Sequence, residues 1–298
     1  MSLKLKQQCI EKKKFGDYTI NLLGNGKYSQ VYKICKQRNC EALKEIKNTE
    51  FITRDSNGSE ILFLYYCKQL NDAGITENLQ NSLSFYNCPS CKTFYSLNDI
   101  ESGDCWKFFE TKRNVSEWKS LYFQLLAGIY TFQRYLDGIH FDLHPGNVLF
   151  SYKSPVKGTC KLYIINKKKY YLPCTGFTFK IADFGISYSK SLQIFNPDRM
   201  YNYKHYLKIK KGRYFDPRQI DTLVIAGSYY QNAIDLRGHP KVQEIEYFVD
   251  YWIYLAETGV KYSFQLIKEL FQEYTVIPKN AKVVKTFNLD QNFLVKLK

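Results

Sequence analysis

Hydrophobic and polar side chains alternate along residues 18–46, and Gly24 and Gly26 interrupt the alternation. A period of two is typical of strands with one buried face, and glycines between two such runs are typical of a tight turn. The sequence therefore predicts three antiparallel strands, at residues 18–23, 30–34 and 42–46. Two more strand candidates follow, at residues 83–86 and 106–110.

Helical spacing is found between and after these strands. Residues 59–70 carry a broad apolar face behind Ser59, a candidate helix cap. Residues 114–139 place large apolar side chains three and four positions apart, and Asn114 with Glu117 fits a capping box. Further helical runs are expected at residues 244–257 and 263–274.

The order of these elements predicts an α+β fold with two lobes. Residues 1–110 would form a small antiparallel, β-rich N-lobe with one helix, and residues 111–298 an abbreviated, mainly helical C-lobe. A Lys- and Tyr-rich stretch between residues 150 and 178 is expected to form a hairpin with a basic turn at 166–169, and a solvated loop is favoured there over a binding patch.

Composition narrows the class of protein. The 298 residues include 43 Lys and Arg against 28 Asp and Glu, a net charge of +15, so acidic or nucleic-acid partners are candidates for the basic surface. Apolar runs such as residues 125–130 are far shorter than the roughly 20 residues of a membrane span, and none is expected. Nine cysteines, an odd count, without a secretory signal at the start predict a reducing, intracellular compartment, the cytoplasm.

A glycine loop lies between the first two predicted strands. It comprises Gly24, Asn25, Gly26, Lys27, Tyr28 and Ser29, followed by Val31. Glycines allow the backbone N–H groups to approach a phosphate closely, although a structural hairpin explains the same residues equally well. A dinucleotide-binding turn is excluded because no helix follows the loop.

Lys44 lies in the third predicted strand, among apolar residues that include Ala42. A buried ammonium is costly unless it meets a negative partner. Phosphate oxygens and a carboxylate from the next helix would both serve, and Glu60 is the best placed candidate, ahead of Glu45 and Glu50.

Two acidic segments follow the long helix. Asp142 and Asn147 lie five residues apart on a loop between that helix and a short strand, where they can present a carboxylate base and a metal-binding amide. A second strand ends at Asp183-Phe184-Gly185, where the carboxylate can hold Mg²⁺.

Taken together, residues 18–227 resemble the protein kinase superfamily, whose signature elements occur here in the same order. The resemblance implies ATP as cosubstrate, with Mg²⁺ or alternatively Mn²⁺, and transfer of the γ-phosphoryl group to Ser or Thr of protein substrates. It implies that Lys44 holds the α- and β-phosphates, and that Glu60 orients Lys44. The nucleotide site would comprise Gly24, Asn25, Gly26, Lys27, Tyr28, Ser29, Val31, Ala42, Lys44 and Glu60.

The resemblance also assigns the catalytic roles. Asp142 would accept the proton of the acceptor hydroxyl, Asn147 and Asp183 would bind the metal, and Asp221 would brace the catalytic loop. Residues 106–112 would lead into the hinge that binds adenine.

Several positions depart from the family pattern. Ser29 replaces the third glycine, Phe141 replaces the arginine of His-Arg-Asp, and no Ala-Pro-Glu follows Asp183. In style the chain resembles the compact serine/threonine kinases of large DNA viruses, which would place it in host cytoplasm or virion. His144-Pro145-Gly146 is similar to small-molecule phosphotransferases of the aminoglycoside and choline kinase type, and a pseudokinase scaffold is the third alternative.

Cys88-Pro-Ser-Cys91 could supply two zinc ligands, with Cys67 or Cys105 as further ones. Structural or free thiols are favoured over this reading. His140 is expected to pack and hydrogen-bond beneath the catalytic loop rather than to transfer protons.

Overall fold

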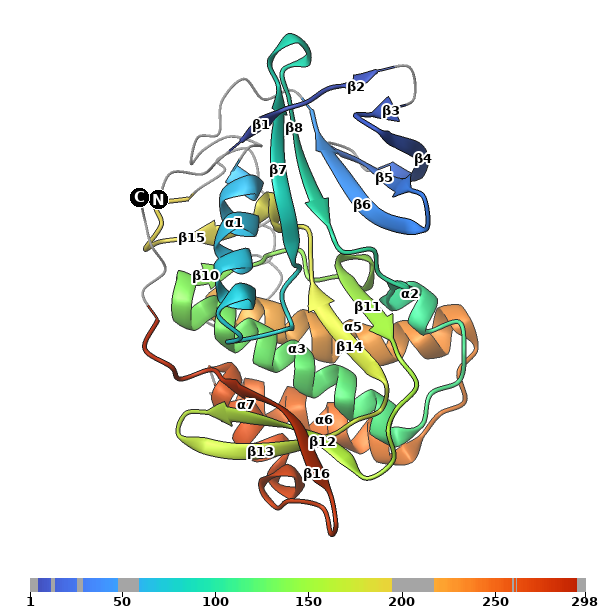
Figure 1. Cartoon of the computed structure of the whole chain (residues 1–298). Helices are drawn as coiled ribbons and strands as arrows, with labels where there is room; N and C mark the ends of the chain where they lie inside the picture. The colour runs from blue at the N-terminus through green and yellow to red at the C-terminus, as the bar shows by residue number, and fades with distance from the viewer. Residues whose placement is uncertain are drawn as a thin grey trace.

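The computed structural model describes residues 5–11, 14–25, 29–47, 59–194, 217–258, 260 and 262–293. It is an α+β protein with a curled, largely antiparallel sheet above a group of helices, an arrangement compatible with two lobes (Figure 1). The division of the chain at residue 110 stays a prediction.

The large sheet has eight strands. Its spatial order is β1-β7-β8-β6-β5-β4-β3-β2, and all neighbours are antiparallel except β1 and β7. The strands are β1 (Lys6–Gln7), β2 (Ile10–Glu11), β3 (Lys14–Phe15), β4 (Tyr18–Asn25), β5 (Ser29–Lys36), β6 (Asn39–Ile46), β7 (Ser82–Cys88) and β8 (Thr93–Asn98).

The sequence predicted β4, β5, β6 and β7 but missed β8, the sheet neighbour of β6. The strand predicted at residues 106–110 is wrong, because the short helix α2 (Cys105–Phe108) lies there. Asp104 caps this helix by accepting a hydrogen bond from the backbone N–H of Lys107 at 3.0 Å. The cap turns the chain into a helix where periodicity alone suggested an extended segment.

The helices surround α3 (Val115–Leu136), whose predicted capping box is confirmed. Asn114 accepts from the Glu117 N–H at 2.9 Å, and the Glu117 carboxylate accepts from the Asn114 N–H at 3.0 Å. The other helices are α1 (Ser59–Asp72), α5 (Ile220–Arg237), α6 (Gln243–Glu257) and α7 (Ser263–Leu270). The predicted helix over residues 263–274 is therefore two pieces, α7 and a 3₁₀ turn, η6 (Gln272–Thr275).

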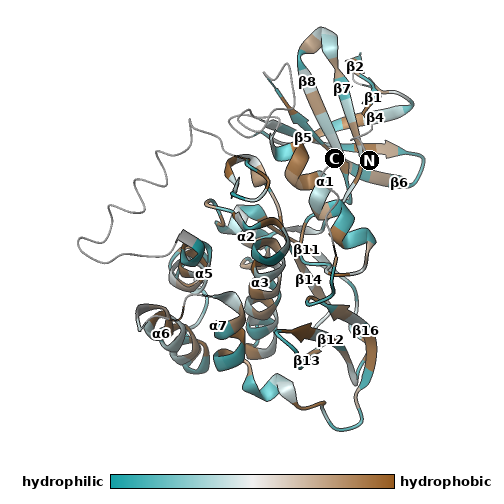
Figure 2. Cartoon of the chain, turned by 90° about the vertical axis from the view of Figure 1, so that its left-hand side faces the viewer, coloured by the Kyte–Doolittle hydropathy of each residue, from teal (hydrophilic) through white to brown (hydrophobic). Residues whose placement is uncertain are grey.

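Two three-stranded sheets lie beside α3. One has the order β14-β11-β9, from Phe177–Ile181, Val148–Tyr152 and Gly103–Asp104. The other has the order β13-β12-β16, from Lys168–Pro173, Thr159–Ile165 and Lys282–Asn288. A small pair, β10 (Gly138–Ile139) and β15 (Tyr188–Ser189), completes the described sheets. Figure 2 shows β12, β13 and β16 on one side of α3 and the helices α5 and α6 on the other.

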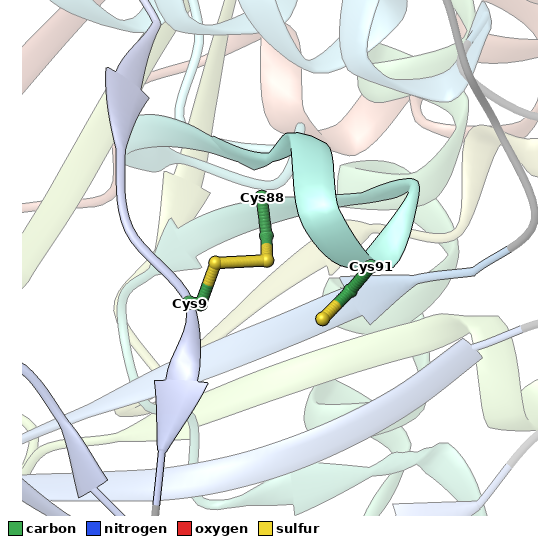
Figure 3. Close-up of side chains that lie close together, drawn as sticks. All are labelled: Cys9, Cys88 and Cys91. Atoms are coloured by element: carbon green, nitrogen blue, oxygen red, sulfur yellow. A yellow bond between two sulfur atoms is a disulfide. The ribbon is translucent and has the colours of Figure 1, made fainter.

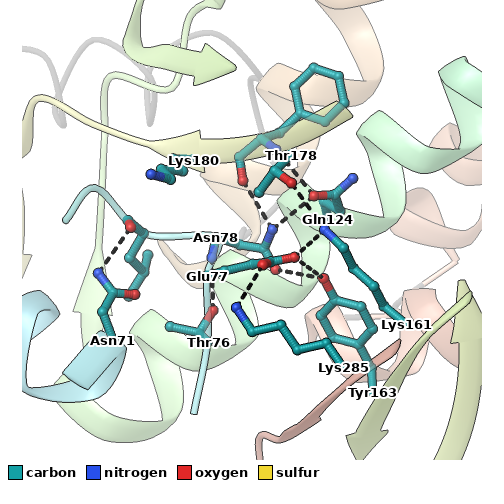
Figure 4. Close-up of polar contacts among 12 residues, drawn as sticks. Asn71, Thr76, Glu77, Asn78, Gln124, Lys161, Tyr163, Thr178, Lys180 and Lys285 are labelled. Carbon is teal, nitrogen blue, oxygen red and sulfur yellow. Dashed lines mark hydrogen bonds and ion pairs between the residues drawn. The ribbon is translucent and has the colours of Figure 1, made fainter. Parts of the chain in front are cut away.

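The hairpin predicted between residues 150 and 178 is confirmed as β12 and β13, but its third strand was missed. Strand β16 pairs in parallel with β12 over Thr159↔Lys282 to Ile164↔Asn288. Glu77 fastens this sheet to the rest of the chain through Lys161, through Lys285 Nζ at 3.1 Å and through the Tyr163 hydroxyl at 3.5 Å (Figure 4).

The main hydrophobic core joins α1 to the helices below it. Phe63 of α1 packs on Phe132 of α3 with ring centroids 5.5 Å apart, and both side chains are buried. A smaller core, which includes Phe15, Leu43 and Tyr95, lies within the large sheet. No helix among the described residues is long and apolar enough to cross a membrane.

Four of the nine cysteines form disulfides, Cys9–Cys88 and Cys35–Cys40. The prediction of a reducing compartment gains no clear support from this pairing.

Candidate active site

The Lys44 side chain forms two ion pairs in the interior. Its Nζ lies 2.6 Å from Glu60 Oε1 and 2.9 Å from Asp183 Oδ1. The sequence predicted Glu60 as the partner, and this prediction is confirmed. The second carboxylate, Asp183, comes from a segment 139 residues further along the chain.

The local structure explains how these groups meet. Lys44 lies in β6 opposite Val31 of β5 and Ser96 of β8, so it is held in the middle of the sheet. Glu60 is in the first turn of α1, whose apolar face is buried. A carboxylate in the first helical turn is favoured by the helix dipole, which supports its place beside an ammonium.

Neighbouring charges shift the pKa values of Lys44 and Asp183. Burial by itself would lower the pKa of Lys44, but the carboxylates of Asp183 and Glu60 outweigh burial and raise it. The Lys44 ammonium lowers the pKa of the Asp183 carboxyl to about 2. At neutral pH the Asp183 carboxylate is therefore ionised beside the Lys44 ammonium, and 45% of the Asp183 side chain remains exposed.

A fixed loop carries Asp142. The buried Asp221 carboxylate accepts hydrogen bonds from the backbone N–H groups of His140 at 2.8 Å and Phe141 at 2.9 Å. His140 is also buried, and its Nε2 lies 2.9 Å from the Ala182 carbonyl oxygen. The packing role expected for His140 is confirmed, and Asp221 holds the loop as anticipated.

Strand pairing brings the loop to Asp183. Val148, at the start of β11, is opposite Ile181, at the end of β14, in an antiparallel pair. The residue before β11, Asn147, consequently lies beside the residues after β14, and its carbonyl accepts from the Ala182 N–H at 2.9 Å. The pairing of β11 with β14 therefore brings the loop that bears Asn147 to the segment that bears Asp183.

Asn147 also fixes the position of Asp142. Its Nδ2 donates to the Asp142 carbonyl at 2.8 Å and to the Asp142 carboxylate at 3.2 Å. The Asp142 side chain is 43% exposed, and His144 Nε2 lies 3.9 Å from its Oδ2. Asn147 thus orients the Asp142 carboxylate, which remains partly exposed to solvent.

Phe184 anchors the segment that follows Asp183. Its buried ring lies 5.2 Å from Phe132, 6.1 Å from Phe63 and 5.4 Å from His140 between centroids. Asp183 itself has φ 60° and ψ 68°, and Phe141 has φ 66°. Left-handed backbone at non-glycine residues costs about 1–3 kcal/mol each. The described residues also adopt it outside this site, for example at Gln37 and Lys92.

The glycine loop is only partly described. Gly24 and Asn25 are exposed at the end of β4, opposite Val31 and Gln30 of β5. Ser29 begins β5, and Ala42 lies in β6 two residues before Lys44. Gly26, Lys27 and Tyr28 lie outside the described residues. The described residues on either side of the predicted loop therefore belong to two paired strands, and the second of these, β5, pairs with β6, the strand of Lys44.

The oxygen atoms present suit a hard divalent cation. Asp183 offers a carboxylate that is half exposed, and Asn147 donates through its nitrogen, which leaves its amide oxygen for a ligand. Carboxylate and amide oxygens are the donors that Mg²⁺ takes in proteins. The two predicted metal ligands thus fit such an ion.

Residues 106–112, which were predicted to lead into an adenine-binding hinge, do not begin with a strand, and adenine binding stays a prediction. Residues 106–108 belong to α2, and the connection from β8 to α2 is residues 99–104, which include β9. The hinge was predicted at 106–112 because a strand was expected at 106–110. The strand that precedes this part of the chain is instead β8.

A cavity of about 590 Å³ lies elsewhere, between the Glu77 contacts and β14. It is lined by residues such as Asn71, Lys161 and Phe177, and none of the predicted site residues lines it. The cavity therefore does not locate the candidate chemistry.

No protein-family model matches the sequence, and no curated protein matches it closely enough to count as a relative. A function is therefore inferred from the geometry of the site.

Proposed function

We propose that the chain is an ATP-dependent protein kinase that transfers a phosphoryl group to Ser or Thr hydroxyls. The observation that carries the proposal is the Lys44 ammonium between the carboxylates of Glu60 and Asp183, beside the loop that bears Asp142 and Asn147. A lysine held by a helix carboxylate, a metal-binding aspartate and a catalytic-loop aspartate are the recurring parts of this chemistry.

Positioning and charge neutralisation would supply most of the rate enhancement. Lys44 would neutralise charge on the α- and β-phosphates, with Glu60 keeping its ammonium directed at them. Asp142, oriented by Asn147, would align the acceptor hydroxyl and take its proton. Asn147 and Asp183 would hold Mg²⁺, which neutralises charge on the phosphate oxygens when bound.

The test is phosphate transfer from γ-labelled ATP to a protein acceptor such as casein, followed by identification of the labelled residues. Asp142→Asn should lower turnover by about 10²–10⁴-fold and leave the melting temperature and ATP affinity near those of the parent. Asp137→Asn is the matched control, because Asp137 is an exposed carboxylate in left-handed backbone, a conformation that Asn tolerates.

Two outcomes contradict the proposal. One is an Asp142→Asn chain that phosphorylates casein as fast as the parent. The other is a parent that binds no Mg-ATP, which would favour a scaffold of this fold without activity.

A small hydroxyl compound is the second candidate acceptor, and one observation favours it. His144, followed by Pro145-Gly146, is half exposed and directs Nε2 to within 3.9 Å of the Asp142 carboxylate. A panel of amino alcohols and aminoglycosides offered with labelled ATP separates the two acceptor classes. Label on a small compound and none on protein would select this candidate.

A further inference from the structure

Three cysteines outside the candidate active site lie together at the large sheet (Figure 3). Cys9 lies between β1 and β2, Cys88 ends β7, and Cys91 ends the 3₁₀ turn η1 (Pro89–Cys91). Their Sγ atoms all lie within 4.8 Å of one another. In the structure Cys9 and Cys88 form a disulfide, and Cys91 is a free, exposed thiol.

Backbone pairing explains why the three residues meet. Strand β1 runs parallel to β7, and the Gln8 N–H continues this pairing by donating to the Asn87 carbonyl at 3.0 Å. The next residue along each strand is a cysteine. Pro89 then starts the η1 turn, and Lys92 closes it in left-handed backbone, which returns Cys91 toward Cys88.

We propose that Cys9, Cys88 and Cys91 bind one Zn²⁺ ion through three thiolates when the disulfide is reduced. Two intervening residues, as between Cys88 and Cys91, is a spacing that zinc sites use. Tetrahedral zinc with Zn–S bonds of about 2.3 Å holds sulfur atoms about 3.8 Å apart. Cys9 follows only two residues of strand and can move by the small distance that this separation requires.

An oxygen atom is available for the fourth position. The Ser90 hydroxyl lies 3.3 Å from Cys88 Sγ, 3.6 Å from Cys9 Sγ and 3.9 Å from Cys91 Sγ. This hydroxyl, or a water beside it, completes four-coordination. The sequence favoured structural or free thiols over zinc here, and it named Cys67 or Cys105 as the possible further ligands. Both of these are buried free thiols outside the cluster, and the third sulfur comes from Cys9.

A dithiol reductant opens the site by reducing the Cys9–Cys88 disulfide. The dithiol supplies two electrons and two protons to the Cys9–Cys88 bond and closes to its own disulfide. Three thiol protons then leave to buffer as three Zn–S bonds form.

The ion would perform the same structural task as the disulfide. Cys88 is fully buried and packs in the smaller core with Phe15 and Tyr95, whereas Cys9 belongs to the N-terminal segment. A link between them ties the segment between β1 and β2 to the end of β7. Zinc would maintain this link in a reducing compartment, where the disulfide opens.

The experiment uses the full chain, reduced by a dithiol, desalted without oxygen and titrated with Co²⁺ and then Zn²⁺. We expect about one equivalent of Co²⁺ per chain with the d–d and charge-transfer bands of tetrahedral thiolate coordination, and displacement of Co²⁺ by Zn²⁺. Cys91→Ser should lose these bands and weaken binding by more than the roughly 10–100-fold cost of removing an outer-shell group.

Cys174→Ser is the matched control, since Cys174 is a partly exposed free thiol outside the cluster, and its titration should equal that of the parent. Zn²⁺ should also raise the melting temperature of the reduced parent but not of Cys91→Ser. Because Cys91 is exposed, its replacement keeps the fold, and circular dichroism of the metal-free chains checks this.

Three results would overturn the proposal: no Co²⁺ binding by the reduced parent, thiolate bands unchanged in Cys91→Ser, or a Cys88–Cys91 disulfide after reduction, which would indicate thiol–disulfide exchange. None of these readouts uses ATP, so they are independent of the proposed kinase activity.

Discussion

The Lys44 ammonium lies 2.6 Å from the Glu60 carboxylate, and only 8% and 5% of the two side chains are exposed. This buried pair connects β6 to α1. Removing one partner of a buried pair costs about 3–5 kcal/mol when the remaining charge has no other partner. Here Asp183 stays beside Lys44, so the loss is smaller.

We therefore expect Glu60→Ala to lower the free energy of unfolding by roughly 1–3 kcal/mol, the cost of a lost buried hydrogen bond to a charged group. Chemical denaturation measures the change. Asp17→Ala, which removes the exposed pair with Lys36, is the control and should cost much less, because solvent screens this pair. Equal losses in the two variants would show that burial does not strengthen the Lys44 pair.

Asp221 should influence catalysis through the backbone it holds. Asp221→Ala leaves the buried N–H of His140 and the N–H of Phe141 without their acceptor, at roughly 1–3 kcal/mol each. Turnover should fall because the loop that bears Asp142 is no longer held in place. The KM for ATP should change little because Lys44 and Glu60 are untouched. Steady-state kinetics at a temperature where the variant is folded gives both values. A large rise in the KM with unchanged turnover would contradict the positioning role.

The Asp183 carboxyl should make stability depend on acid. Its pKa is 3.8 without perturbation and about 2 in the fold, so the ionised form is favoured by folding. The contribution is fully present above pH 3.8 and is lost as the pH falls toward 2. The parent should therefore be more stable than Asp183→Asn at neutral pH, and the difference in melting temperature should shrink below pH 3.8. A difference that stays constant down to pH 3 would rule out this linkage.

Glu77 should contribute more to the stability of the β13-β12-β16 sheet than either of its lysine partners alone. Glu77→Ala removes contacts to Lys161, Lys285 and Tyr163, and we expect a loss of about 1.5–3 kcal/mol. Lys285 is 53% exposed, so Lys285→Ala should cost less than about 1 kcal/mol. Denaturation curves and hydrogen exchange in β16 report both effects. Faster exchange in Lys285→Ala than in Glu77→Ala would reverse this order.

Much of the candidate site could be predicted from the sequence because its residues have local signals. Lys44 is a charged residue in an apolar strand, and Asp142 and Asn147 lie on the same short loop. The Glu60 contact could be anticipated since α1 follows β6 directly. The Lys44–Asp183 contact depends on long-range packing, and only the resemblance linked these two residues.

The missed elements depend on contacts that no local pattern encodes. Strand β8 has all six residues buried, so it lacks the alternation that marks a half-exposed strand. Strand β16 is largely exposed and exists through its pairing with β12. The third sulfur near Cys88 and Cys91 could not be identified either, because Cys9 reaches them only through the parallel pairing of β1 with β7.

The parallel pairing of β16 with β12 also sets an order of events during synthesis. The hairpin of β12 and β13 is made before β16, so the edge of β12 that bonds β16 has no strand to pair with until the residues between Pro173 and Lys282 have also been made. During that interval, nascent chains would expose an unpaired strand edge that can pair with another chain. Shielding of this edge until β16 is made would limit aggregation of the newly synthesised protein.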